Sequence, residues 1–163
     1  DNDLDKFEEF ILKNDFGAFS DAPWCFPNLY KFLYEKFPNA KFILTTRSTE
    51  SWIESYKNLY ERHLPNHKEL ERLPFIDNEK EYGWIHPILF DGSTKITGNE
   101  HIYKKVFESY NSDVISFFKN KPGSLLVIDW SKEKDPSRVY EFLNKKSTNI
   151  KVPWVKDERK LYD

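Results

Sequence analysis

Residues 37–55 decide the fold class of this chain, and they read Phe37-Pro-Asn-Ala-Lys-Phe-Ile-Leu-Thr-Thr-Arg-Ser-Thr-Glu-Ser-Trp-Ile-Glu-Ser55. An apolar run at 42–44 ends in the polar residues Thr45-Thr46-Arg47, and Ser48-Thr49-Glu50 then supplies a helix-start signal. This order predicts a buried strand at 41–46 that leads directly into a helix at about 49–62. A strand followed at once by a helix is typical of α/β proteins.

The rest of the chain continues this alternation of strand and helix patterns. A short apolar run predicts a second strand at 124–129, and the segment 16–20 is compatible with a further strand that ends at Asp21. Strands alternating with helices favour a three-layer α/β fold with a mainly parallel sheet flanked by helices. Residues 63–97 lack periodicity and carry Pro and Gly residues, so we expect an irregular region there. Amphipathic periodicity predicts four more helices, at 3–13, 28–37, 99–119 and 136–145.

Composition limits the classes of protein to which the chain can belong. Its 163 residues suit one domain, and its net charge of −2 without a basic tract argues against a nucleic-acid partner. One cysteine and four scattered histidines lack the spacing of a metal site. No apolar run approaches the roughly 20 residues of a membrane span, and no signal peptide is visible. We therefore expect a cytoplasmic protein without a membrane partner.

Arg47, Ser51 and Ser55 form a candidate anion site. In open α/β sheets, ligands bind beyond the carboxyl ends of the strands, where Arg47 is expected to stand. Its planar fork of donors suits phosphate. Ser55 lies inside the new helix, roughly 9–10 Å from the helix start at about 1.5 Å per residue. Ser51 is one turn earlier on the same helical face, and Ser48 and Thr49 are expected to cap the helix.

The stretch 37–55 resembles the phosphate-site segment of the sulfotransferases of the P-loop superfamily. Residues 21–24, Asp-Ala-Pro-Trp, are similar to the Asp-x-Pro segment of one branch of that family, and residues 123–130 and 139–143 are similar to its late strand and following helix. The resemblance implies a P-loop-NTPase-like fold. It also implies that Arg47 and Ser55, with Ser51 as a weaker candidate, hold the 3′-phosphate of 3′-phosphoadenosine 5′-phosphosulfate.

The resemblance further implies the reaction, which is transfer of a sulfuryl group to a hydroxyl or amine of a small-molecule acceptor, without a metal. Residues 63–97 would form the acceptor lid of a single domain, 1–163. Asp21 stands where many sulfotransferases carry a histidine base, so it is the candidate catalytic residue. Its residue type leaves three roles open: a base, an acceptor-orienting group, or a cap for the turn before Pro23.

The chain departs from the family in lacking a Gly-rich phosphate loop after a first strand, because Gly17 and Gly123 are isolated. Such a loop is expected before residue 1, in about 20–50 preceding residues, a number estimated from the size of a βαβ unit. One alternative is therefore a catalytically inactive binding module that has kept the fold. A less favoured alternative is a P-loop small-molecule kinase, for which Asp129, at the end of strand 124–129, is a candidate Mg²⁺ carboxylate.

Overall fold

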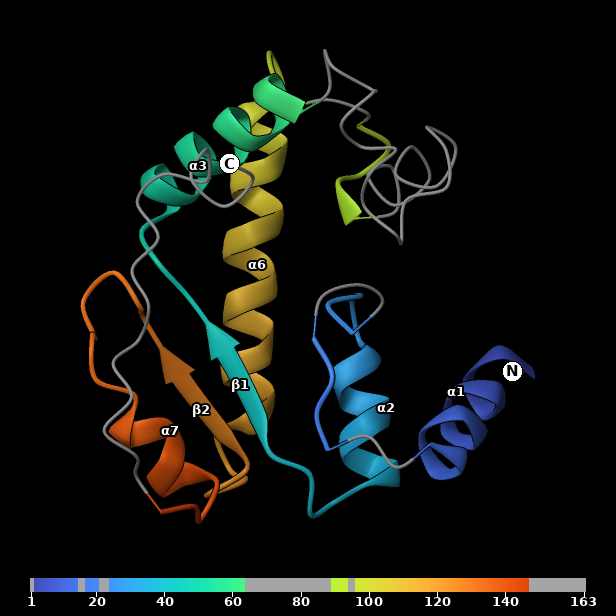
Figure 1. Cartoon of the computed structure of the whole chain (residues 1–163). Helices are drawn as coiled ribbons and strands as arrows, with labels where there is room; N and C mark the ends of the chain where they lie inside the picture. Colours follow the sequence, from blue (N-terminus) through green and yellow to red (C-terminus); the bar gives the residue numbers. More distant parts are fainter. Residues whose placement is uncertain (1, 15–16, 21–23, 64–88, 94–95, 147–163) are drawn as a thin grey trace.

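A computed structural model of the chain describes residues 2–14, 17–20, 24–63, 89–93 and 96–146 (Figure 1). The predicted helices and two of the predicted strands are present, with ends that differ by a few residues. Residues 17–20, the described part of the segment 16–20, form no strand, so the further strand that the sequence allowed is not present there; this part contains Gly17 and Ala18 and no β-branched residue. The elements in chain order are α1 (Asn2–Lys13), α2 (Leu29–Lys36), β1 (Phe42–Thr45), α3 (Thr49–His63), α6 (Glu100–Phe118), β2 (Leu125–Ile128) and α7 (Ser137–Phe142).

β1 and β2 lie side by side as a parallel pair, in register from Phe42 opposite Leu125 to Thr45 opposite Ile128 (Figure 1). The ladder continues beyond β1, because the Thr46 N–H donates to the Ile128 carbonyl at 2.8 Å. Parallel strands need a long crossover, which here includes α3 and α6. The chain is therefore a mixed helix–strand protein with a parallel sheet, compatible with the expected α/β class.

One face of this sheet packs on α6, which passes behind β1 in Figure 1. Leu44 of β1 is buried with Val114 and Phe118 of α6, and Tyr30 of α2 joins the same cluster. Val114 and Phe118 are one turn apart, so they hold the inward side of the helix. The neighbouring Ile115, although apolar, is 47% exposed.

A second cluster joins α3 to the start of α6. Tyr103 is completely buried, and its ring stacks on Phe90 with centroids 4.0 Å apart and planes at 19°. Ile53 of α3 and Ile96 are buried with them. This packing, centred on Tyr103, holds α3 against the start of α6. None of the helices in the described ranges has both the length and the apolar character needed to cross a bilayer.

Candidate functional site

Arg47 lies where the chain leaves the sheet. β1 ends at Thr45, Thr46 bonds to the end of β2, and α3 begins at Thr49. Arg47 is therefore at the carboxyl ends of two parallel strands and directly before a helix, as the sequence predicted. This is the edge at which α/β sheets bind ligands.

The guanidinium group of Arg47 is half-buried and turned onto Ser51. Its Nε and Nη2 atoms donate to Ser51 Oγ at 3.2 and 2.7 Å. Within the described ranges, no carboxylate forms an ion pair with Arg47. A half-buried cation without a carboxylate partner favours an anionic ligand, because desolvated charges are otherwise costly.

The first turn of α3 adds polar groups to the same place. The Ser51 N–H donates to Ser48 Oγ at 3.2 Å, so Ser48 is a side-chain cap of the helix, as expected. Thr49 behaves differently from the expected cap, because its hydroxyl donates to Glu108 Oε1 of α6 at 2.9 Å. The positive end of the α3 dipole thus lies beside Arg47.

Ser55 lies one turn beyond Ser51 and is exposed. Trp52 and Tyr56 on the other side of the helix pack into the core cluster, so Ser51 and Ser55 share the outward row. Arg47 hydrogen-bonds to Ser51 and not to Ser55. The structure therefore joins Arg47 to the serine that was the weaker candidate, and places Ser55 further along the same row.

Asp21, the candidate catalytic residue, lies outside the described residues. Residues 64–88 of the predicted acceptor lid also lie outside them. Phe19 and Trp24, on either side of Asp21 in sequence, are described, and their ring centroids are 4.2 Å apart. The described end of the lid region includes Phe90 and Ile96, which belong to the core cluster under α3.

Asp129, the candidate Mg²⁺ carboxylate of a kinase, directly follows the end of β2, at the same edge of the sheet. Its Oδ1 accepts from the Ser131 N–H at 2.9 Å and from the Ser131 hydroxyl at 2.5 Å, and its Oδ2 lies 3.1 Å from Lys132 Nζ. The Ser131 hydroxyl bond is the main cause that lowers the pKa of Asp129. Its oxygens thus serve a local turn, which an Asp followed two residues later by Ser could have indicated.

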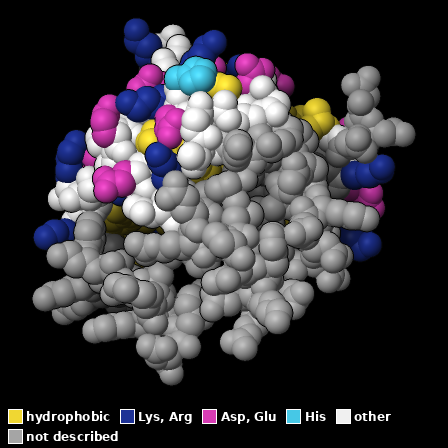
Figure 2. All heavy atoms as spheres, turned by 90° about the horizontal axis from the view of Figure 1, so that it is seen from above, with side chains coloured by type: hydrophobic (Ala, Val, Ile, Leu, Met, Phe, Trp, Pro, Cys, Tyr) yellow, Lys and Arg dark blue, Asp and Glu magenta, His cyan; other side chains and the backbone are white. Residues whose placement is uncertain are grey.

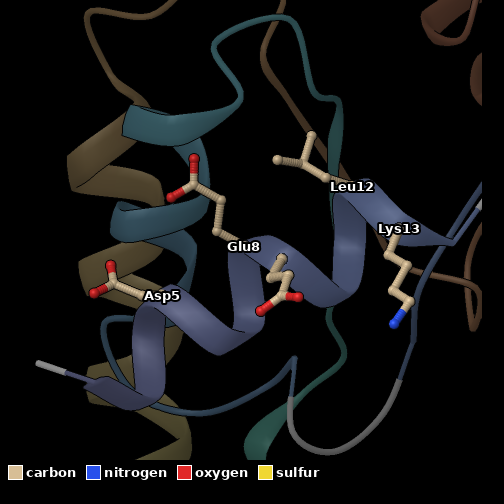
Figure 3. Close-up of a pocket in the computed structure, with 5 residues that line it drawn as sticks. Asp5, Glu8, Leu12 and Lys13 are labelled. Atoms are coloured by element: carbon tan, nitrogen blue, oxygen red, sulfur yellow. The ribbon is translucent and has the colours of Figure 1, made fainter.

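A concavity along α1 fits a phosphate less well than the Arg47 site does. Asp5, Glu8, Glu9, Leu12 and Lys13 line an open concavity of about 490 Å³ along α1 (Figure 3). Its carboxylates outnumber its single cation, and they disfavour an anion.

Basic and acidic side chains are interspersed on the described part of the face in Figure 2, so an anion would be held by local hydrogen-bond donors rather than by a broad positive electrostatic field. The described residues contain no group of three metal-ligating side chains.

A family profile described as a sulfotransferase domain matches residues 3–161. The chain belongs to the sulfotransferase-domain family. The match confirms the resemblance drawn from residues 37–55, and it indicates a transferase whose general chemistry is sulfuryl transfer. A comparison with curated proteins gave no match. The matched range includes both parallel strands and the β1–α3 junction that carries Arg47.

Proposed function

We propose that this sulfotransferase-family protein transfers the sulfuryl group of 3′-phosphoadenosine 5′-phosphosulfate to a hydroxyl or amine of a small-molecule acceptor. The observation that carries the proposal is the guanidinium of Arg47, half-buried at the strand ends and not paired with any described carboxylate. Family membership supplies the sulfuryl chemistry, and the anion-binding geometry supplies a place for the nucleotide donor.

Arg47, Ser51 and Ser55 would hold the 3′-phosphate of the donor. Ser51 Oγ already accepts from two guanidinium donors of Arg47, so the fork is oriented before a ligand arrives. A phosphate oxygen can take the place of the hydroxyl oxygen, because both accept N–H bonds and the phosphate adds charge. The Ser51 hydroxyl can then donate to the phosphate, and Ser55 can do the same from one turn along α3.

In the proposed reaction, the acceptor oxygen or nitrogen forms a bond to sulfur while the bond from sulfur to the bridging phosphate oxygen breaks. Adenosine 3′,5′-bisphosphate leaves, and the acceptor proton passes to a base, a role that we assign to Asp21. By analogy with phosphoryl transfer, positioning and charge stabilisation would supply most of the rate. The resemblance implies no metal in these steps.

The proposal includes the wider organisation that the family resemblance implies. A three-layer P-loop-type fold would place the two described strands within a larger parallel sheet. Residues 1–163 would form one domain, with residues 63–97 covering the acceptor. The protein would act in the cytoplasm on a small molecule and not on a nucleic acid. The parallel pairing of β1 and β2 supports the sheet.

The donor proposal can be tested by comparing two nucleotides in titration calorimetry. We expect adenosine 3′,5′-bisphosphate to bind at least about tenfold more tightly than adenosine 5′-monophosphate, because only the first carries the group that Arg47 would hold. Equal affinities would refute the 3′-phosphate site. Radiolabelled donor with a panel of phenols and amines then tests turnover, and tight binding without any turnover would indicate the inactive binding module.

The role of Asp21 needs a separate measurement. Asp21→Asn is expected to lower turnover by about 10²-fold or more while leaving the affinity for the bisphosphate within about twofold, because the amide cannot accept the acceptor proton. If the affinity for the bisphosphate falls as far as turnover does, Asp21 has a structural role at its turn instead.

A further inference from the structure

Helix α6 presents a row of charged residues that bond to α3. Glu100, Lys104 and Glu108 are spaced four residues apart and so lie on one side of the helix. Lys57 Nζ lies 2.9 Å from Glu100, and Lys104 Nζ lies 3.4 Å from Glu50. The Thr49 hydroxyl donates to Glu108 at 2.9 Å. These pairings run in opposite order along the two helices, so Glu108 meets the first residue of α3.

An aromatic stack lies next to the Glu108 contact. Trp52 of α3 and Phe107 of α6 stack with centroids 4.5 Å apart and planes at 14°. Two consecutive residues of α6 therefore contact the first turn of α3, Glu108 through a hydrogen bond and Phe107 through ring stacking. We call Thr49, Trp52, Phe107 and Glu108 the α3 clamp.

The clamp holds the turn that carries the anion-binding groups. The Trp52 N–H donates to the Ser48 carbonyl at 2.9 Å, and the Ser51 N–H donates to Ser48 Oγ. The clamp residues Thr49 and Trp52 thus flank Ser51 in sequence, while their side chains reach α6. The ends of helices open at low free-energy cost unless they are tied down, and an open first turn would carry Ser51 away from Arg47.

We propose that Glu108, acting through Thr49, is a positioning residue for the anion site. The inference rests on the proposed function, since it assigns the clamp to the site that would hold the donor's 3′-phosphate. The role assigned to Glu108 requires no contact with the ligand or with the reacting atoms. It fixes the first turn of α3, so that Ser51 and the helix N-terminus meet the anion without a cost for ordering that turn.

The charge of Glu108 makes the inference testable. A carboxylate near an anion site repels the anion, so electrostatics alone predicts that removing Glu108 strengthens binding. Positioning predicts the opposite for Glu108→Ala, which loses the acceptor for Thr49. Glu108→Gln removes the charge but keeps a side-chain oxygen in place, and it should preserve binding.

The experiment measures the affinity of the full chain for adenosine 3′,5′-bisphosphate by calorimetry. We expect Thr49→Val and Glu108→Ala each to weaken binding by about three- to tenfold. The double variant should lose no more affinity than the single variant with the larger loss, because both substitutions remove the same hydrogen bond. Thr49→Ser and Glu108→Gln should stay within about twofold of wild type. Glu100→Ala, which breaks the Lys57 pair at the far end of the same interface, is the matched control and should also stay within about twofold.

Three outcomes would overturn the inference. These are unchanged affinity in Thr49→Val and Glu108→Ala while Arg47→Ala weakens binding, tighter binding in Glu108→Ala, or an equal loss in Glu100→Ala. A wild-type chain that binds no bisphosphate would refute the proposed function. Amide hydrogen exchange tests independently whether the α3 clamp stabilises the first turn of α3. The Ser51 and Trp52 amides should exchange faster in Thr49→Val than in Glu100→Ala, and equal exchange rates would overturn the inference.

Discussion

Replacing Arg47 with alanine is expected to abolish the preference of the chain for a nucleotide that carries a 3′-phosphate. Nε and Nη2 of Arg47 donate to Ser51 Oγ, and no described carboxylate neutralises its charge. A bound phosphate would therefore meet an oriented cation. Arg47→Ala removes that cation while leaving Ser48 to cap α3.

The size of the effect follows from the kind of bond that is lost. A hydrogen bond to a charged group contributes about 1.5–3 kcal/mol, and each 1.4 kcal/mol is about tenfold in affinity. Because Arg47 is only half-buried, solvent weakens the interaction, and we expect the lower part of that range, a loss of about 10- to 50-fold. Arg47→Lys keeps the charge but not the planar fork, so its loss should be intermediate.

The assay is calorimetry of each variant with adenosine 3′,5′-bisphosphate and with adenosine 5′-monophosphate. The loss should appear with the bisphosphate and not with the monophosphate. Arg138→Ala is a control that removes the same charge elsewhere, since Arg138 pairs with Glu133 and donates to the Val127 carbonyl. If Arg47→Ala weakens both nucleotides equally, or neither, Arg47 does not hold a 3′-phosphate.

Three further predictions concern stability. Tyr103→Ala should lower the free energy of unfolding in urea by about 3–5 kcal/mol, because the fully buried ring stacks on Phe90. Gly123→Ala should cost about 1–2 kcal/mol by the same measurement, since Gly123 has φ +75° and a side chain there is strained. The Ser131 hydroxyl lowers the pKa of Asp129 below its ordinary 3.8, so this stabilisation is present above that value and is lost as the pH falls through the folded pKa. In a series of thermal-unfolding measurements at different pH values, Asp129→Asn should therefore reduce the fall of the melting temperature at acid pH. An unchanged fall of the melting temperature at acid pH would contradict this.

The parts of the fold that could be predicted from the sequence are those that depend on local signals. The apolar run at 42–44 and the Ser48 cap fix the end of β1 and the start of α3 to within a residue or two. The run before Asp129 similarly locates β2 at Leu125–Ile128. Alternation of these elements then predicted a parallel pairing, which the register of β1 and β2 confirms.

Packing details could not be predicted, because they depend on which elements meet. On α2, Leu29 and Tyr30 are buried while Leu33 is only partly buried; Tyr30 is buried because its ring meets Phe117 and Phe118 of α6. On α1, Leu12 is 70% exposed despite its place in an amphipathic helix. Periodicity identifies an apolar side of a helix but does not show how much of it a neighbour covers.

The candidate site shows the same division. Its location at the strand ends followed from the order of residues, but the choice between Ser51 and Ser55 did not. Arg47 turns onto Ser51 because a spacing of four residues brings the hydroxyl within reach, whereas Ser55 lies about 6 Å further along the helix axis. The contact from Thr49 to Glu108 joins residues 59 positions apart, and neither residue type marks such a contact in advance.

Two long-range contacts fix the position of Arg47, one on each side of it in sequence. Before it, the bond from the Thr46 N–H to the Ile128 carbonyl sets where the chain leaves the sheet. After it, the bond from Thr49 to Glu108 sets where the helix begins. Only Arg47 and Ser48 lie between these two contacts, so the backbone position of Arg47 depends on the positions of β2 and α6. Substitutions that shift either element should therefore change anion affinity even though neither element carries an anion-binding side chain.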